Sequence, residues 1–518
     1  MTRRTHFDLI VIGAGINGAG IARDAALRGL SVLVLEKGDI ANGTSSWSTR
    51  LIHGGLRYLE HFEFGLVRES LHERENLLRI APHLVKPIPI LMPIYKNAIR
   101  GSLTLRIGML AYDFLSLGKT LPSHQILSRA QTLAKFPSLN ASGLVSGAIY
   151  YDCQVEFAER LVVENILAAK QDGAEVETYS RVTKLSEGEV QFVRRGSESI
   201  VIATAKLIIN AAGPWVDQLL ATSTEFPGKR LIGGTKGSHI VVKSFPGASS
   251  TAIYVEAESD GRPFFVIPWN DNYLIGTTDI RFDGNLDEVR SDEWEIRYLL
   301  NETNRVLPEA NLGIDDVCYC YSGVRPLPFT TNADAKSITR RHFIHEHEKI
   351  KNLFSIVGGK LSTYRSLAEE CVDLVFTRLG RQSPHCSTNE LPLPGAMPML
   401  DPANEHSDKI LMRLTRIYGS NRGELAKLCV QSPELSRTFN QDRNAIGAEI
   451  VYAFQSESAT TLADCLLRRT MLGLNSDLAI GDDLAAAEIG REFLGWSEQR
   501  ANDEVAQYRR EIDRMLIK

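Results

Sequence analysis

Hydrophobic residues in the N-terminal part of the chain form short apolar runs separated by an amphipathic segment. Residues 7–12 are an apolar run that stops at a glycine turn, as a buried parallel strand does. Residues 16–29 carry apolar positions at helical spacing and end near a glycine, and residues 31–35 form a second apolar run. This order predicts a β–α–β unit that starts at residue 7.

Farther along the chain the pattern predicts more helices and strands. Amphipathic helical spacing occurs over residues 61–83 and 156–171, and helices are also expected near 291–305 and around 363–379. Apolar or alternating stretches that predict strands occur at 206–210, 238–242, 264–268, 273–277 and 354–360. A polar link with prolines, residues 383–402, leads to a C-terminal third with a wholly helical pattern. We therefore expect a boundary near 385–400 and two domains, residues 1–385 and 386–518.

Composition restricts the functional classes. Of the 518 residues, 43% are hydrophobic and 23% charged, as is usual for soluble globular proteins with sizeable cores. The net charge of −5 gives no support to nucleic-acid binding. Seven cysteines without C-x-x-C spacing favour a reducing compartment over a disulfide framework. No long apolar run and no signal-like N-terminal core occur, so neither a spanning helix nor secretion is expected.

The turn after the first predicted strand has the pattern G-x-G-x-x-G at Gly13, Gly15 and Gly18. The first glycine permits a tight turn, the second lets backbone approach a pyrophosphate, and the third lets the helix pack on the strand. Glu36 ends the second predicted strand, where a carboxylate can bond a ribose 2′-hydroxyl and would repel a 2′-phosphate. These positions predict a site for FAD or NAD; the alternative is a glycine-rich turn that binds nothing.

The segment 43–58 lies just downstream and combines hydroxyls, a histidine, a glycine pair and two arginines. His53 and Arg57 are four residues apart and would share a face if the segment coils helically. A histidine beside a guanidinium suits a general base next to an anionic substrate. The alternative for His53 is a structural role, in which its imidazole bonds a backbone group.

Two further cations, Arg325 and Lys360, lie beside glycine turns. Together with Arg57 they could hold a phosphate monoester, since an arginine fork makes paired bonds to phosphate oxygens. The alternative for each cation is a solvated surface charge. Three cations at three glycine turns of an acidic chain favour the phosphate interpretation.

The run 341–347 contains three histidines, of which His345 and His347 invite a metal interpretation. Flanking charges and an alternating pattern predict an exposed hairpin instead. The chain also lacks the calcium-loop, G-x-S-x-G and H-E-x-x-H patterns. No metal site is expected.

Seven ordered motifs resemble the FAD-dependent (aerobic, quinone-linked) glycerol-3-phosphate dehydrogenases. They are GAGINGAG (13–20), TSS (44–46), LIHGGLRYLE (51–60), KGSHIVV (236–242), IGTTD (275–279), YSGVRP (321–326) and GGKLSTYR (358–365). The resemblance spans about residues 6–370, and the helical C-terminal third is similar to the cap domain of that family. It implies an α/β fold: an FAD-binding Rossmann-type (glutathione-reductase-like) domain with an inserted antiparallel-sheet substrate domain, followed by an all-helical C-terminal domain.

The resemblance also implies an activity in glycerol metabolism. Such enzymes oxidise sn-glycerol 3-phosphate to dihydroxyacetone phosphate by hydride transfer from C2 to N5 of FAD, and pass electrons to ubiquinone or menaquinone. The implied setting is cytoplasmic, peripheral (monotopic) on the inner leaflet of the cytoplasmic membrane, with a homodimer as the oligomeric state. Residues 86–119, which form part of the membrane-facing base in bacterial relatives, carry few cations here. The calcium-binding extension of mitochondrial relatives is missing, so calcium activation is not expected.

Individual roles follow from the resemblance. Arg57, Arg325 and Lys360 are implied to bind substrate and to belong to the catalytic set, with Tyr58 and Thr277 as further substrate contacts. Two histidines compete for the role of base: we prefer His53, and His239 is the competitor because it lies in a motif of the family. The implied FAD contacts are Gly13, Gly15, Ile16, Asn17, Gly18, Glu36, Lys37, Thr44, Ser45, Ser46, His53, Gly54, Gly55, Gly213, Trp215, Gly359, Lys360, Leu361 and Ser362.

Two other functions are compatible with the same residues. A glycerol-3-phosphate oxidase would use molecular oxygen as acceptor and yield hydrogen peroxide; the chain has no obvious long extra insert of the oxidase kind, which favours a quinone. A non-catalytic FAD-binding regulatory protein would bind a flavin that glycerol 3-phosphate cannot bleach. The cations around the predicted cofactor site argue against this second alternative.

Overall fold

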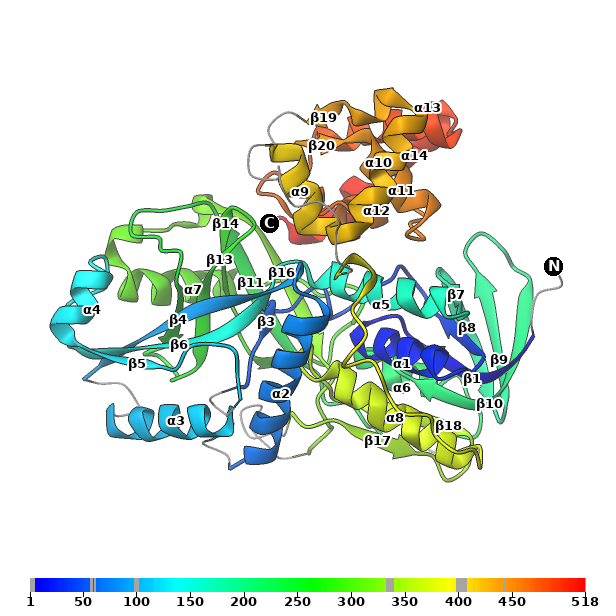
Figure 1. Cartoon of the computed structure of the whole chain (residues 1–518), viewed down its shortest axis with the longest axis horizontal. Coiled ribbons are helices and arrows are strands. Elements are labelled where there is room, and N and C mark those ends of the chain that lie inside the picture. The colour runs from blue at the N-terminus through cyan, green and yellow to red at the C-terminus, as the bar shows by residue number, and fades with distance from the viewer. Residues whose placement is uncertain are drawn as a thin grey trace.

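The computed structural model describes residues 5–517 apart from 56–58, 60–61, 97–101, 117, 227, 332–339, 397–407 and 441–443, with only the backbone of 102–107. Figure 1 shows an α/β part that holds the N-terminus, beside it a part built on a second sheet, and a helical C-terminal part above both. The predicted fold class is confirmed: a Rossmann-type domain, an inserted and mostly antiparallel sheet, and a C-terminal helical domain.

The first sheet begins with the predicted β–α–β unit. β1 (His6–Ile12) leads through α1 (Ile16–Leu27) to β2 (Val32–Leu35), and β1 pairs in parallel with both β2 and β10 (Ile200–Asn210). The other strands are β7 (Glu175–Glu177), β8 (Ser180–Ser186), β9 (Glu189–Arg194), β17 (Phe343–Glu346) and β18 (Leu353–Val357). The strand order is β17-β18-β10-β1-β2-β7, with the β8–β9 hairpin alongside β10.

Both faces of this sheet are covered, which explains the continuous apolar run of β1. Leu9 and Val11 pack in one core with α1, α5 (Ala158–Gln171) and α8 (Tyr364–Arg378). Ile10 and Ile12 face the other way and pack against α6 (Val216–Leu220) and the β8–β9 hairpin. Successive side chains of a strand point to opposite faces, so a strand between two covering layers is apolar at every position.

The second sheet forms the other main part of the molecule. Its strands are β3 (Leu51–Ile52), β4 (Val85–Tyr95), β5 (Gln125–Ser128), β6 (Leu144–Val155), β11 (Thr235–Val242), β12 (Ala252–Glu256), β13 (Pro263–Trp269), β14 (Asn272–Gly276), β15 (Ile280–Arg281) and β16 (Val317–Arg325). The order is β15-β11-β14-β13-β12-β4-β6-β3, with β16 on β11 and β5 on β6. The accompanying helices are α2 (Phe64–Ile80), α3 (Ser102–Leu115), α4 (Arg129–Lys135) and α7 (Glu293–Val306). Among the described strand pairs of this sheet, only β12–β4 is parallel.

The C-terminal part consists of helices that share a core with the second sheet. They are α9 (Lys409–Tyr418), α10 (Arg422–Gln431), α11 (Gly447–Gln455), α12 (Leu462–Arg468), α13 (Asp482–Leu494) and α14 (Glu498–Ile512), followed by a 3₁₀ turn (Asp513–Met515). The prediction of a wholly helical third is wrong in one detail, because β19 (Thr438–Asn440) and β20 (Ala445–Ile446) form a small antiparallel pair.

The histidine-rich run also differs from its predicted exposure. The hairpin exists as β17 and β18, but His347 is buried and its Nε2 lies 2.9 Å from Ser355 Oγ. The rings of His345 and His347 are in contact with each other. In the described part of the chain, no helix is both long and apolar enough to span a membrane.

Candidate active site

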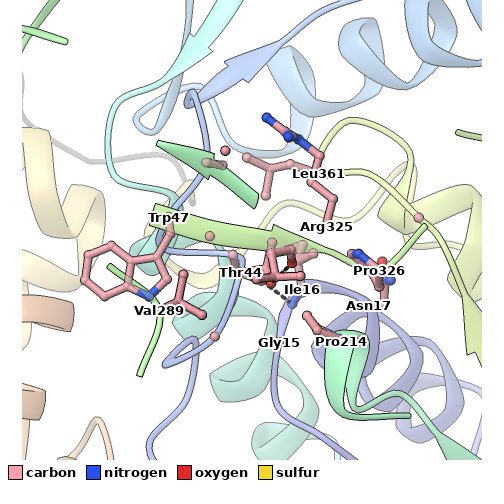
Figure 2. Close-up of a pocket in the computed structure, with 18 of the residues that line it drawn as sticks. Gly15, Ile16, Asn17, Thr44, Trp47, Pro214, Val289, Arg325, Pro326 and Leu361 are labelled. Carbon is pink, nitrogen blue, oxygen red and sulfur yellow. Dashed lines mark hydrogen bonds between the residues drawn. The ribbon is translucent and has the colours of Figure 1, made fainter. Parts of the chain in front are cut away.

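A cavity of about 910 Å³ lies where the two sheets meet, within the size range of cofactor and ligand sites. Its wall includes the turn after β1, the loop after β2, the end of β16 and the turn after β18. Figure 2 shows Gly15, Ile16 and Thr44 near its centre, with Arg325 and Leu361 from distant parts of the chain close by. The fold therefore brings the sequence motifs to one place.

The glycine fingerprint has the geometry that its pattern predicts. Gly13 has φ +110°, and a Cβ there would lie 2.6 Å from the carbonyl oxygen of Ala211, which directly follows β10. A Cβ on Gly18 would lie 1.9 Å from the carbonyl oxygen of Gly13, so α1 can approach β1 only with glycine at this position. Gly18 serves this packing and is not part of the cavity wall.

The loop after β2 carries three consecutive residues with hydroxyl groups, of which one contacts the start of α1. Ser45 Oγ accepts a hydrogen bond of 3.0 Å from the backbone amide of Ile16, and Thr44 Oγ1 donates to the carbonyl oxygen of Val324 at 2.6 Å. The free amides and the dipole of a helix N-terminus favour phosphate. Ser46 differs from its neighbours, because its Oγ donates to Ala41 and it is buried outside the cavity wall.

Glu36 and Trp215 also line the cavity. The Glu36 carboxylate accepts hydrogen bonds of 2.8 Å from the backbone amides of Ala14 and Gly38, which fixes it beside the fingerprint. Lys37 Nζ lies 4.3 Å from the centre of a Trp215 ring and 2.6 Å from Asp287. Gly213 also lines the cavity.

The turn after β18 approaches the start of α1. Gly358 and Gly359 have φ of +82° and +94°, and a Cβ on Gly359 would lie 2.5 Å from Asn17 Nδ2. Asn17 Oδ1 is buried without a hydrogen-bond partner in the described structure. An orphaned acceptor in a glycine-lined cradle fits a bound polar ligand such as a dinucleotide. Leu361 and Ser362, which follow in the same turn, also line the cavity.

Several cations also line the cavity. Arg325 Nη2 donates to Thr277 Oγ1 at 3.0 Å, and Arg325 Nη1 lies 3.1 Å from Asp279. Arg340 contacts the other oxygen of Asp279 at 3.0 Å. Burial alone would raise the pKa of Asp279, but Arg325 and Arg340 overcome this effect and hold it below its usual value. Lys360 lines the same cavity.

Sequence reasoning missed Arg340 and Asp279 as site residues. Arg340 has no glycine turn beside it, and Asp279 was noted only as the last residue of a motif. Their roles depend on contacts between β15, β16 and the segment before β17, which no local pattern reveals. Arg57 and Tyr58 lie outside the described residues, so the structure does not place them.

Both candidate bases line the cavity, and the pKa of each imidazole is below its usual value. Burial lowers the pKa of His53, and nearby Lys360 and Arg340 lower it further. Burial also lowers the pKa of His239, well below its usual value, with added effects from Arg325 and Arg50. An imidazole that is unprotonated near neutral pH is able to accept a proton.

The two imidazoles differ in their contacts. His239 Nε2 lies 2.9 Å from Thr49 Oγ1, and its ring stacks on Tyr321 with the ring centres 4.9 Å apart. The described contacts of His53 are a backbone hydrogen bond to Ser362 and an edge contact between its ring and Phe265, 6.4 Å between centres. The ring of His239 is therefore the more firmly fixed of the two.

A buried polar cluster supports the glycine pair after His53. Asp152 Oδ1 accepts from Arg74 at 2.7 Å and from the hydroxyl of Tyr112 at 2.8 Å. That hydroxyl also accepts from the backbone amide of Gly54 at 3.0 Å. Gly54 thus faces away from the cavity towards α2 and α3, whereas Gly55 is part of the cavity wall.

Comparison with known proteins identifies the family. Residues 8–363 match the family described as FAD dependent oxidoreductase, and residues 386–501 match that described as C-terminal domain of alpha-glycerophosphate oxidase. The glycerol-3-phosphate dehydrogenase of Synechocystis sp. is 44% identical, with 99% of this chain and 98% of the relative covered. The aerobic glycerol-3-phosphate dehydrogenase of Escherichia coli is 37% identical, with 91% of this chain and 95% of the relative covered.

A solved structure agrees over nearly the whole chain. The X-ray structure of the glycerol-3-phosphate dehydrogenase from Bacillus halodurans, complexed with FAD, is 29% identical with a TM-score of 0.79. The alignment covers 99% of this chain and 97% of that one. The glycine cradle and the orphaned Asn17 acceptor fit the same cofactor, so FAD is the cofactor of this protein. The chain belongs to the FAD-dependent glycerol-3-phosphate dehydrogenase family.

Proposed function

We propose that the protein oxidises sn-glycerol 3-phosphate to dihydroxyacetone phosphate and passes the electrons to a membrane quinone. The observation that carries the proposal is that one cavity is lined both by the glycine cradle that fits FAD and by several cations. The names of the full-length relatives support the same substrate. Bound FAD supplies a hydride acceptor at N5, and the residues that line the cavity bind the substrate and accept its proton.

The cations that line the cavity suit a phosphate monoester. Arg325 is held by Thr277 and Asp279, so its fork is oriented before substrate arrives. Arg340 shares Asp279 and adds a second guanidinium, and Lys360 adds an ammonium to the same wall. Among the described residues, Asp279 is the carboxylate that both guanidiniums contact, and guanidinium forks make paired bonds to phosphate oxygens.

The reaction also needs a base for the proton of the C2 hydroxyl as hydride leaves C2. His53 remains the preferred base, because its imidazole lines the cavity and its ring is less firmly fixed, with an edge contact to Phe265 as its described ring contact. His239 is the competitor, and its ring is already engaged by Thr49 and Tyr321. A base that accepts the proton as the C–H bond breaks accelerates such reactions on the order of 10²–10⁴-fold.

Exposed apolar side chains support a membrane surface as the site of electron transfer. Phe62 is 79% exposed and Phe64, at the start of α2, is 45% exposed. On α3, Leu110 and Phe114 are 63% and 70% exposed. Large apolar groups gathered on two neighbouring helices are typical of a membrane or protein contact. α2 and α3 lie on the side of the molecule opposite the C-terminal helices (Figure 1).

Anaerobic stopped-flow absorbance of the purified holoenzyme tests the proposal. Glycerol 3-phosphate should bleach the visible flavin band, and glycerol alone should leave it unchanged. If glycerol 3-phosphate does not bleach the flavin, the proposed dehydrogenase activity is wrong and the non-catalytic FAD-binding alternative is supported. Aerobic turnover with a quinone analogue should give little hydrogen peroxide, whereas one peroxide per substrate would identify the oxidase.

A further inference from the structure

The end of the C-terminal domain reaches the FAD cavity. Arg514 and Met515, more than a hundred residues beyond the dinucleotide domain, are part of the cavity wall. The carbonyl oxygen of Met515 lies 3.5 Å from Cys320 Sγ on β16, and Asp513 pairs with Arg290 at 3.0 Å. In Figure 1 the C-terminus lies next to the second sheet. The last turn of the chain is therefore docked on the wall of the site.

The C-terminal domain also holds the loop after β2 at Asp39. Asp39 Oδ2 lies 2.6 Å from Arg468 Nε, and Asp39 Oδ1 lies 2.7 Å from Arg469 Nη2. All three side chains are almost completely buried. Removing one member of a buried ion cluster leaves an uncompensated charge, so this contact fixes the loop to the C-terminal helices.

A second contact lies at the other end of the same loop. The Arg514 guanidinium lies 4.9 Å from the centre of the Trp47 ring. Trp47 also lies close to β16: a Cβ on Gly323 would lie only 2.9 Å from Trp47 Cβ, and the rings of Trp47 and Tyr321 are 5.5 Å apart. Trp47 is thus held between β16 and the C-terminal turn, at the edge of the cavity (Figure 2).

One charge network joins the two contacts. Glu511 Oε1 lies 3.1 Å from Arg468 Nη1 and 3.6 Å from Arg514 Nη2. The residues that contact Asp39 and Trp47 are therefore linked to one another within the C-terminal domain. Between Asp39 and Trp47 lies the loop that presents Ser45 to the amide of Ile16 at the start of α1.

We propose that the C-terminal helical domain is a component of the FAD site: it clamps the loop 39–47 at both ends, with Arg514 as a positioning residue. A loop that is already ordered binds FAD more tightly than a loop that becomes ordered only on binding, because less conformational entropy is lost. Loss of the clamp should therefore weaken FAD binding without removing any group of the fingerprint. The inference depends on FAD as cofactor and not on the identity of the substrate.

The test compares Arg514→Ala with Arg510→Ala in the full-length protein. Arg510 is the control because it has the same residue type and lies four residues earlier, on α14. Its side chain is exposed and makes no contact that the structure describes. Titration of apoprotein with FAD, followed by flavin fluorescence, should give a Kd at least tenfold higher for Arg514→Ala. The same change to Arg510 should leave Kd within twofold. Arg514→Lys keeps a cation over Trp47 and should fall between Arg514→Ala and the wild type.

Thermal unfolding separates a role in the cofactor site from general stability. A ligand raises stability according to its concentration relative to Kd, so a tenfold weaker FAD should shrink the FAD-induced rise in Tm. The Tm of the Arg514→Ala apoprotein should stay close to that of the wild-type apoprotein. A lower apoprotein Tm with an unchanged FAD-induced rise would overturn the proposal, as would an unchanged Kd. Failure of glycerol 3-phosphate to bleach a tightly bound flavin would instead count against the proposed function alone.

Discussion

The backbone amide of His53 donates a hydrogen bond of 3.2 Å to Ser362 Oγ, although the two residues are 309 positions apart in the chain. The Ser362 hydroxyl in turn lies 3.5 Å from the carbonyl oxygen of His53. This pair ties the turn after β3 to the turn after β18, which carries Lys360. The preferred base and a cation of the cavity wall are therefore held in a fixed relation by the backbone.

His53→Asn should slow flavin reduction by glycerol 3-phosphate on the order of 10²–10⁴-fold, because asparagine has no basic nitrogen. Anaerobic stopped-flow measurement of the reduction rate at saturating substrate checks this. His385, which is 78% exposed, provides a matched histidine-to-asparagine control that should keep the wild-type rate. A rate within a few-fold of wild type for His53→Asn, together with a large loss for His239→Asn, would transfer the role to His239.

Protonation of buried His239 should destabilise the protein at acidic pH. Its pKa is well below the usual value because of burial, so the unfolded chain binds the proton at a higher pH than the folded one. The free energy of unfolding should therefore fall as pH drops below about 6.5, by up to about 1.4 kcal/mol per pH unit for this group. Urea unfolding at pH 7.5, 6.5 and 5.5 measures the slope. His239→Gln should make the dependence of the free energy of unfolding on pH smaller. An identical slope in the wild type and in His239→Gln would show that His239 does not cause the loss of stability.

Arg325→Lys should raise the KM for glycerol 3-phosphate about 10- to 100-fold while changing kcat less. The guanidinium of Arg325 has enough donors to bond Thr277 and Asp279 and also the phosphate. The single ammonium of a lysine cannot make all of these bonds at the same time. The loss of a charged hydrogen bond is worth roughly 1.5–3 kcal/mol. Steady-state kinetics with a soluble acceptor measures both constants. Arg230→Lys is the control, since Arg230 pairs with Asp283 on the exposed surface; an equal KM change in both variants would show that Arg325 is no substrate ligand.

The sequence predicted the parts of the site that depend on short-range chemistry. A glycine that needs positive φ or close approach, such as Gly13, leaves a local pattern, and so does the acid at the end of the next strand, Glu36. The Arg340–Asp279 contact joins residues 61 positions apart, and no spacing rule relates them. The packing of Gly54 against Tyr112 similarly depends on how α3 folds onto the second sheet. These relations come from tertiary contacts, which one sequence does not encode in a readable local pattern.

The burial of His347 is a second feature that depends on tertiary contacts and was not predicted from the sequence. The alternating run 341–347 predicted a surface hairpin, and alternation does place residues on two faces of a strand. The strand β17 itself is exposed or half-buried along its length, as an exposed hairpin would be. His347 follows β17 directly and is buried against Ser355 of β18, and its pKa falls to about 4 through burial and the nearby His345. The alternating pattern therefore predicts the strand β17 but does not show which residues pack against the end of that strand.

Gly359→Ala should weaken FAD binding at least tenfold. The residue has φ +94°, where an L side chain is strained, and its Cβ would lie 2.5 Å from Asn17 Nδ2. Gly423→Ala is the control, because Gly423 lies within α10 with open space around its Cβ and should gain stability from the better helix former. Fluorescence titration of each apoprotein with FAD compares the dissociation constants. Equal FAD affinity in the two variants would show that the turn after β18 adapts freely and does not shape the cofactor site.

Phe114→Asp should reduce binding to lipid vesicles more than tenfold. The side chain is 70% exposed on α3, and burying a phenylalanine in an apolar phase is worth about 1.5–3 kcal/mol, to which the added charge contributes a further cost. Co-sedimentation with phosphatidylglycerol–phosphatidylcholine vesicles measures the partition. Leu484→Asp introduces the same charge at a side chain that is 56% exposed on α13, in the C-terminal domain, and should bind as the wild type does. If both variants bind alike, α3 is not the membrane contact, and if the wild type itself stays in solution, the acceptor must be reached without a membrane.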